Sequence, residues 1–345
     1  MNRCERLAGN AYEIGLTHGQ VFKRNIAANV KLTLEDWLPA WNPGRTEAAR
    51  AWALSQRERH FARWPWLAEE IRGIADGSSI PCETIELLNF RAWQFFLYGA
   101  GGACTSFIGR SADAGLVLGG ALDDPRELYG MVDVAPRNGF RFMTFSLLGT
   151  TWASRGVNAA GLAIGISSLP LTGLRHVETM WQQDFCLRVM LQTCADCAAV
   201  EAFCREHVFS LNVMAVDAGG NRLALSRTGL GCYIHGPEMS VLANHLPTPA
   251  LEALHRAAGW DGVVGAPTST CRAEQMAGFL QRREGAFSLL EAQAELARRD
   301  MANDACVNNA QTCFLTLAAP ASLPGQWQVA ERPAMAGSFE TFKMA

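Results

Sequence analysis

Cys104 is the residue of this chain whose type and position offer the clearest chemistry. It follows the run GAGGA at residues 99–103 and precedes the strand-like run TSFI at residues 105–108. Glycine-rich backbone adopts conformations that other residues avoid, so it can bend the chain until the Cys104 thiol meets the Ala103 carbonyl. Attack would form a thioester as the C–N bond breaks, which would free an α-amino group on Cys104, and hydrolysis of the thioester would then separate the two segments. The sequence therefore predicts self-cleavage between Ala103 and Cys104.

The freed amino group would give the thiol its own base. A cysteine thiol has an ordinary pKa of about 8.5 and an α-amino group one of about 8, so a proton can pass between them near neutral pH. One residue then supplies both the nucleophile and the general base. This chemistry needs no histidine, and the seven histidines of the chain occupy no recognisable catalytic spacing. We therefore expect an N-terminal cysteine nucleophile that attacks an amide carbonyl.

Several short runs occur along the chain in a characteristic order and spacing. Together they resemble the peptidase C45 family, which includes the acyl-CoA:6-aminopenicillanate acyltransferases and related cysteine N-terminal-nucleophile amidohydrolases. The resemblance covers nearly the whole chain. The runs are YEIGLTHG at 12–19, EIRGIADG at 70–77, GGACTSF at 101–107, GGALD at 119–123, GVNAAGLA at 156–163, ANH at 243–245 and STCR at 269–272.

The resemblance implies a role for four residues around Cys104. Asp123 would bind and orient the Cys104 ammonium group, and Asn244 would help to build the oxyanion hole. Arg272 matches an arginine that balances charge near the nucleophile. Related hydrolases carry an asparagine near the oxyanion at about the position of Ser167, whose hydroxyl could donate a hydrogen bond there.

These residues also have structural interpretations, which the sequence leaves open. Cys104 could be a buried core thiol, as free cysteines commonly are. Asp124 could be the functional aspartate in place of Asp123, although spacing favours Asp123. Asn244 could belong to a simple turn, and Arg272 could lie on the surface of a helix.

The remaining cysteines suggest no metal or redox site. Cys194 and Cys197 have the spacing of a metal-ligand pair, but no second pair follows at ligand spacing, which favours a structural role. Cys271 lies next to Arg272 and has no matching base. We therefore expect no metal and no cofactor, although acyl-CoA could serve as a substrate.

The composition is that of an ordinary globular protein. The chain has 345 residues, of which 49% are hydrophobic and 18% charged, and its formal net charge is −3. No basic surface for nucleic acid is indicated, and we find neither a signal peptide nor an apolar run of membrane-spanning length. The 11 cysteines, an odd number, favour a reducing compartment. These features predict a cytoplasmic protein that binds neither nucleic acid nor a membrane.

The pattern of apolar residues changes near residue 100. Residues 1–103 are predicted to be helical, with helices over 11–37, 45–75 and 84–96. Residues 104–345 contain two blocks of short strands with helices between them, and hairpin turns are expected at 113–115 and 217–221. This order predicts an α+β fold, an αββα sandwich of the N-terminal-nucleophile hydrolase type formed by residues 104–345. The helical segment 1–103 would become the small chain after cleavage and stay attached.

The predicted reaction is transfer of an acyl group from a small-molecule amide to the Cys104 thiol. Water or an amine would then resolve the thioester, so hydrolase and acyltransferase activities both remain open. The alternative is an uncleaved, non-catalytic binding protein on the same fold. We expect the protein to bind a small-molecule amide or acyl donor. The two cleaved segments would stay associated with each other. The sequence leaves open whether the protein also forms a homo-oligomer.

Overall fold

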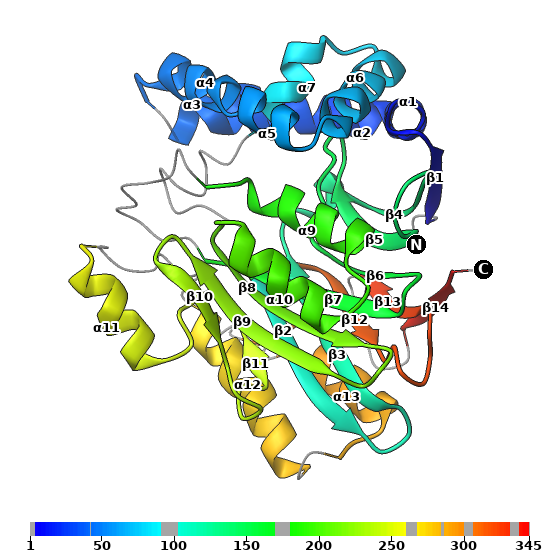
Figure 1. Ribbon diagram of the computed structural model, residues 1–345, viewed down its shortest axis with the longest axis vertical. Coiled ribbons are helices and arrows are strands. Elements are labelled where there is room, and N and C mark those ends of the chain that lie inside the picture. The colour runs from blue at the N-terminus through cyan, green and yellow to red at the C-terminus, as the bar shows by residue number, and fades with distance from the viewer. Residues whose placement is uncertain are drawn as a thin grey trace.

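Figure 1 shows the computed structural model of the chain as a sandwich of two sheets beneath a layer of N-terminal helices. The structure describes residues 4–41, 43–90, 103–169, 180–259, 268–283, 286–299, 306–331 and 338–344. The predicted small-residue connection at 99–102 and the end of the predicted helix over 84–96 lie outside these residues. None of the helices in the described ranges is both long and apolar enough to cross a lipid bilayer.

Among the residues that the structure describes, two sheets form the centre of the molecule. The larger has eight strands, in the order β1 (Glu5–Gly9), β4 (Tyr129–Pro136), β5 (Phe142–Leu147), β6 (Arg155–Asn158), β7 (Leu162–Ser168), β8 (Leu211–Asp217), β9 (Arg222–Thr228) and β10 (Gly231–Ile234). The smaller has six strands, in the order β11 (Val241–Leu242), β2 (Ala103–Ser111), β3 (Gly115–Asp123), β12 (Thr312–Ala318), β13 (Gln326–Glu331) and β14 (Glu340–Lys343).

The sheets face each other across an apolar core. Phe145 on β5 stacks on Phe314 on β12, with ring centroids 4.0 Å apart and an interplanar angle of 9°. Both predicted hairpins are confirmed. Residues 112–114 connect β2 to β3, where Gly115 adopts a φ of +70°, and residues 218–221 connect β8 to β9. Successive side chains along β2 and β3 point to opposite faces of the smaller sheet. One set therefore faces the larger sheet, and the other set faces away from it.

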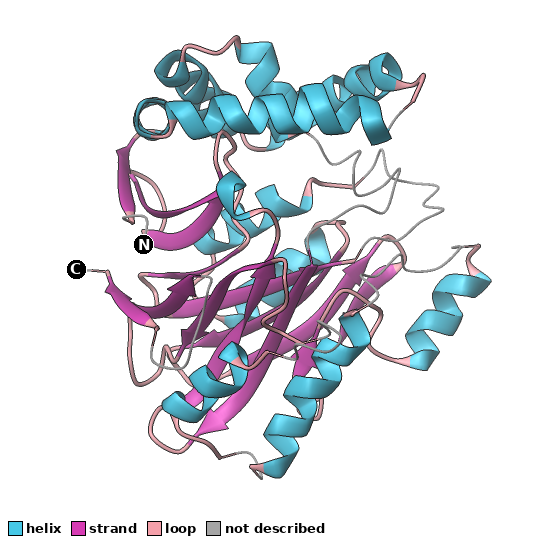
Figure 2. Cartoon of the chain, turned by 180° about the vertical axis from the view of Figure 1, so that it is seen from behind, coloured by secondary structure: helices cyan, strands magenta, loops and turns pink. Residues whose placement is uncertain are grey.

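Helices cover the outer face of each sheet (Figures 1 and 2). The larger sheet is covered by α9 (Gln183–Thr193) and α10 (Cys197–Glu206), and α11 (Pro249–Ala257) lies beyond β10. The smaller sheet is covered by α12 (Ser269–Arg282) and α13 (Leu289–Ala297), which enclose a second core with Phe107 and Leu315. The resulting order of layers is α, β, β, α. It confirms the predicted α+β fold with αββα layers.

The N-terminal segment is mostly helical, as predicted, but it is broken into shorter pieces. These are α1 (Ala11–Val21), α2 (Lys23–Val30), the π-helical turn η1 (Lys31–Trp37), α3 (Leu38–Trp41), α4 (Thr46–Ser55), α5 (Arg57–Arg63), α6 (Trp66–Ser78) and α7 (Cys82–Asn89); a 3₁₀ turn, η2 (Arg126–Leu128), follows β3. The sequence did not predict β1, which pairs in parallel with β4. The N-terminal segment thus also supplies an edge strand of the larger sheet.

The glycines of two of the short sequence runs let α1 and α6 approach backbone to backbone. A Cβ added to Gly15 would lie 2.0 Å from the carbonyl oxygen of Glu70, and one added to Gly73 would lie 2.3 Å from that of Tyr12. Gly19 and Gly77 face backbone atoms at similarly short distances. Only glycine leaves room for this contact, which explains why the two runs share the same small-residue spacing.

Buried polar contacts attach the helical layer to the sandwich. Glu70 on α6 pairs with Arg188 on α9 at 3.1 Å, and both side chains are almost fully buried. His18, Asn29 and Asn89 bond to the backbone of residues 148–151, next to β5. Because removing one partner of such a buried group is costly, these contacts favour continued association of the two parts.

The close contact between α1 and α6 yields a stability prediction. Gly73→Ala should lower the free energy of unfolding by about 1–3 kcal/mol, because its methyl group must push two helix backbones apart. Gly278→Ala is the matched control, since its Cβ would meet only the flexible end of Arg282 at 3.2 Å. That change should be neutral or stabilise by up to about 1 kcal/mol. Urea unfolding of both variants measures the difference, and equal effects would contradict the backbone contact.

Candidate active site

Cys104 is the second residue of β2 and points towards the larger sheet. It belongs to the core cluster that contains Ile108 and Leu122, whereas Phe107 belongs to the cluster beneath α12 and α13. The residue is buried, with 6% of its surface exposed. Ala103, immediately before it, is paired with Asp123 on β3. The bond predicted to be cut therefore lies at the start of a strand, inside the sandwich.

Asn244 binds the backbone nitrogen of Cys104. The antiparallel pairing of β11 with β2 joins Val241 to Phe107 and Leu242 to Ser106, which brings Asn244 opposite Cys104. The Cys104 N–H donates to Asn244 Oδ1 at 2.8 Å. The Asn244 Nδ2 group donates to the carbonyl of Ser168 at 3.0 Å. An amide nitrogen carries two hydrogens, so one N–H remains in addition to the one used by Ser168.

Arg272 binds the other side of the Cys104 backbone. It lies in the first turn of α12 and is completely buried. Its Nη1 donates to the Cys104 carbonyl and to the Thr105 hydroxyl, each at 2.8 Å, and its Nη2 donates to Asn244 Oδ1 at 2.9 Å. The alternative of a residue on the helix surface is therefore wrong. This guanidinium instead joins α12, β2 and the segment after β11.

Asp123 is the acidic partner of Arg272. Its Oδ2 lies 3.3 Å from Arg272 Nη1 and accepts from Asn309 Nδ2 at 3.0 Å, and its Oδ1 accepts from the Thr312 hydroxyl at 2.7 Å. Burial raises the pKa of Asp123, while the Arg272 charge and these two donors oppose the increase. Asp123 thus contacts Arg272, which in turn binds the Cys104 carbonyl, and it pairs with Ala103 across β2 and β3. Neighbouring Asp124 instead accepts a bond from the Tyr129 hydroxyl at 2.8 Å.

Arg155 is a further site residue, which the sequence did not indicate. It begins β6 in the larger sheet, is buried, and directs its guanidinium to the carbonyls of Ala121 at 2.6 Å and Thr105 at 3.3 Å. Gly120 leaves room for it, because a Cβ there would lie 2.7 Å from Arg155 Nη1. Its sequence signal was limited to an arginine immediately before the run GVNAAGLA.

Burial dominates the electrostatics of the nucleophile. It raises the pKa of the Cys104 thiol to about 11, although the positive charges of Arg155 and Arg272 act in the opposite direction. At pH 7 the thiol of the uncut chain is therefore almost entirely protonated. A buried thiol of this kind becomes a nucleophile only when a neighbouring base takes its proton.

The other residues singled out from the sequence have different surroundings. Ser167 on β7 is buried, and its hydroxyl bonds to the carbonyl of Leu242 at 3.3 Å. Cys194 follows the end of α9 and Cys197 begins α10. Both are buried free thiols, and Cys271 is exposed. Within the described ranges, no cluster of three His, Cys, Asp or Glu side chains has an arrangement that could hold a metal ion.

Asn212 is a second residue that the sequence analysis missed, and it holds the segment that carries Asn244. Its Nδ2 donates to the carbonyl of Ala243 at 2.7 Å and to that of His245 at 2.9 Å, one on each side of Asn244. Its Oδ1 accepts from the Ser226 hydroxyl at 2.6 Å. Asn212 thereby fixes the backbone position from which Asn244 reaches Cys104.

Comparisons with known proteins give remote likenesses. No protein-family model matches the chain. Among solved structures, it is similar to a single-residue variant of conjugated bile acid hydrolase from Clostridium perfringens, at 12% identity and a TM-score of 0.49 over 70% of this chain and 92% of that one. It is also similar to a Caenorhabditis elegans N-acylethanolamine-hydrolyzing acid amidase ortholog, at 16% identity and a TM-score of 0.45 over 70% of this chain and 100% of that one.

Penicillin V acylase from Agrobacterium tumefaciens gives a third likeness, at 14% identity and a TM-score of 0.45 over 70% of this chain and 86% of that one. Likenesses this remote assign no activity to the chain. Its membership of the peptidase C45 family therefore stays a prediction.

The position of Asn212 yields a prediction about stability. Asn212→Ala removes the donor that binds the carbonyls of Ala243 and His245 and leaves the Ser226 hydroxyl with His235 as its partner. The free energy of unfolding should therefore fall by about 1–3 kcal/mol. Asn138→Ala is the control, because Asn138 is exposed and such changes usually stay within about 0.5 kcal/mol. Urea unfolding compares the two variants. Equal stability of both would show that Asn212 does not hold the Asn244 segment.

Proposed function

We propose that this protein is a self-processing cysteine amidohydrolase or acyltransferase that uses Cys104 as an N-terminal nucleophile on small-molecule amides. One observation carries the proposal: both backbone groups of a buried cysteine are bound by polar side chains. Asn244 accepts from its N–H at 2.8 Å, and Arg272 donates to its carbonyl at 2.8 Å. A merely structural core thiol has no need of two dedicated polar partners, one of which is a buried cation.

The first step would be the cut between Ala103 and Cys104. The sulfur of the thiol attacks the Ala103 carbonyl carbon, and the thiol proton passes to the Cys104 nitrogen. The C–N bond then breaks, which leaves a thioester. Water hydrolyses the thioester to a carboxyl group on Ala103 and a free thiol on Cys104. The new α-amine would occupy the place of the present N–H, where Asn244 Oδ1 accepts a hydrogen bond.

The second step would be amide cleavage by the mature residue. The α-amine takes the thiol proton, and the thiolate attacks the carbonyl carbon of the substrate. The second N–H of Asn244 Nδ2 would donate to the oxyanion that forms, an interaction worth roughly 3–4 kcal/mol in comparable sites. The C–N bond then breaks, the leaving amine takes the proton from the ammonium group, and an acyl thioester remains on Cys104.

The surrounding charges would support both steps. Arg155 approaches Cys104 from the side of the thiol. Its positive charge makes the pKa of the thiol lower than burial alone would make it. Asp123 would balance Arg272 and, once the chain is cut, help to orient the nearby ammonium group. Ser167 would contribute through the Leu242 carbonyl to which it bonds, or through a donor role towards the oxyanion.

The fate of the acyl thioester separates the two activities. Water would give a carboxylic acid, whereas an amine would give a new amide, and acyl-CoA could supply the acyl group in place of an amide. All three routes share the attack by Cys104. We therefore assign the acyl transfer to Cys104 and leave the acceptor open.

Selective labelling of the mature enzyme tests this proposal. With amidase activity followed on a panel of chromogenic N-acyl amides, iodoacetamide should abolish activity in step with labelling of Cys104 among the 11 cysteines. The α-amine makes this thiol reactive near neutral pH, whereas ordinary thiols are mostly protonated there. Peptide mapping by mass spectrometry identifies the labelled residue.

Two exposed cysteines provide the controls. Cys82 and Cys271 would react first if exposure alone decided the order, so Cys82→Ser and Cys271→Ser should each keep full activity. In the uncut chain the exposed cysteines should be labelled before Cys104, because a pKa of about 11 leaves the Cys104 thiol almost unionised at pH 7. Loss of activity while Cys104 stays unlabelled would refute its role as the nucleophile.

A further inference from the structure

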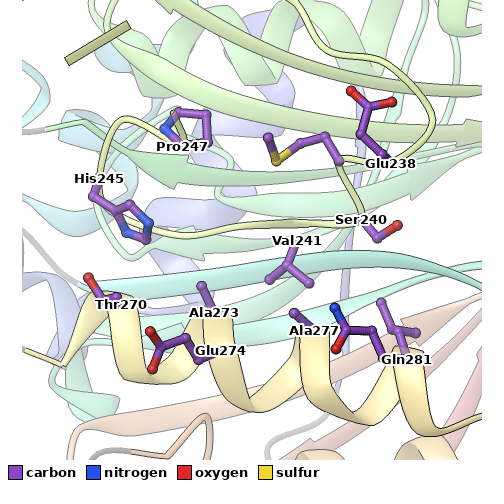
Figure 3. Close-up of a pocket in the computed structure, with 12 residues that line it drawn as sticks. Glu238, Ser240, Val241, His245, Pro247, Thr270, Ala273, Glu274, Ala277 and Gln281 are labelled. Carbon is purple, nitrogen blue, oxygen red and sulfur yellow. The ribbon is translucent and has the colours of Figure 1, made fainter. Parts of the chain in front are cut away.

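A cavity of about 520 Å³ opens beside β11, the edge strand of the smaller sheet. One wall is formed by residues 238–241 and by the loop that carries His245 and Pro247. The other wall is α12, from which Ala273 and Ala277 point towards Val241 (Figure 3). Its volume is within the usual range of about 300–1,000 Å³ for sites that bind small organic molecules.

The cavity is separate from the Cys104 thiol. Val241 and Leu280 line it and belong to the core on the outer side of the smaller sheet, whereas Cys104 belongs to the core between the sheets. Arg272 lies on α12 between the lining residues Thr270 and Ala273, but its side chain is fully buried and directed at Cys104. An acyl group on the thiol would therefore not occupy this cavity.

The walls combine an apolar floor with negative charge. Met239, Val241, Ala277 and Leu280 form apolar surface, and Glu238 and Glu274 supply exposed carboxylates. No lysine or arginine is found among the described residues that line the cavity. Arg222 donates to the carbonyls of Pro237 and Met239 and partly balances Glu238 from behind that wall. Glu274 is therefore the carboxylate that an apolar chain ending in a cation would meet.

His245 completes the polar end of the cavity without adding positive charge. Burial and the nearby Arg272 lower its pKa, so its ring is neutral at pH 7. Its Nδ1 pairs with the Ser269 hydroxyl at 2.7 Å, and the same hydroxyl accepts from the Asn244 N–H at 2.8 Å. The wall at this end is thus held rigidly by the same residues that support the Cys104 site.

We propose that this cavity is a second binding site, which takes an amphiphilic organic ammonium ion, a primary amine on a short hydrocarbon chain. The hydrocarbon would lie on the apolar floor between β11 and α12, and the ammonium group would lie beside Glu274 near His245 and Thr270. Glu238 adds negative charge at the wall formed by residues 238–241. The site is assigned from its own walls and does not depend on the chemistry of Cys104.

Isothermal titration calorimetry with n-octylammonium chloride, below its micelle concentration, tests the proposal. The titration uses the Cys104→Ala chain as well as the wild type, so that binding is measured whether or not the protein cuts itself or has activity. Both proteins should bind octylammonium with the same affinity. Octan-1-ol and octanoate, which share the chain but not the positive charge, should bind at least about tenfold more weakly, because each loses the charge-assisted contact.

Three variants locate the binding. Glu274→Gln should weaken octylammonium binding about three- to tenfold, and Ala277→Phe should weaken it at least about tenfold by filling the floor. Glu127→Gln, an exposed carboxylate on η2 outside the cavity, should leave affinity unchanged. Because Glu274 is exposed, its variant should fold even if Ala277→Phe does not. The proposal is overturned if octylammonium does not bind at millimolar concentration, if octanoate or octanol binds equally well, or if Glu274→Gln and Glu127→Gln behave alike.

Discussion

The buried guanidinium of Arg272 is the interaction on which the candidate site depends. A charge in a protein interior must be paired and hydrogen-bonded, because its desolvation otherwise costs several kcal/mol. Arg272 meets this requirement with the Cys104 carbonyl, the Asn244 side chain and Asp123, which come from three separate segments of the chain. The smaller sheet and α12 can therefore reach their final packing only when the groups around Cys104 are also in position. Folding and assembly of the site are one event in this region.

The nucleophile lies between two arginines that approach from opposite sides. Arg272 reaches the Cys104 backbone from the outer helices, and Arg155 reaches the thiol side from the larger sheet. Their charges do not outweigh burial, which still raises the pKa of the thiol. A resting thiol that is protonated and enclosed needs a base at very short range. The amine that self-cleavage would release on the same residue meets that need, and this is the physical link between processing and activity in our account.

The parts of the fold with local signals were predictable from the sequence. The turns near Gly115 and Gly220 mark two hairpins, and the start of β2 at Ala103 follows from the change of pattern near residue 100. In contrast, β1 is a five-residue strand whose pairing with β4 depends on residues more than 120 positions away. No periodicity within so short a segment could have indicated it.

Some residues of the candidate site could likewise be predicted from the sequence, and others could not. Asp123, Asn244 and Arg272 were proposed because a family resemblance relates their positions, and the structure brings all three to Cys104. Arg155 and Asn212 act through backbone carbonyls that lie far away in the sequence. An arginine or asparagine in a strand carries no sign of such partners, so only the three-dimensional arrangement could identify them.

The central claim is that Cys104 cuts its own chain to become the nucleophile, and the intact mass of the purified protein tests it most directly. Under denaturing conditions the wild type should give two chains, residues 1–103 and 104–345, which elute together from a size-exclusion column under native conditions. The Cys104→Ala protein should give one chain of 345 residues. A single full-length mass for the wild type, or a cut at the same bond in Cys104→Ala, would contradict the account.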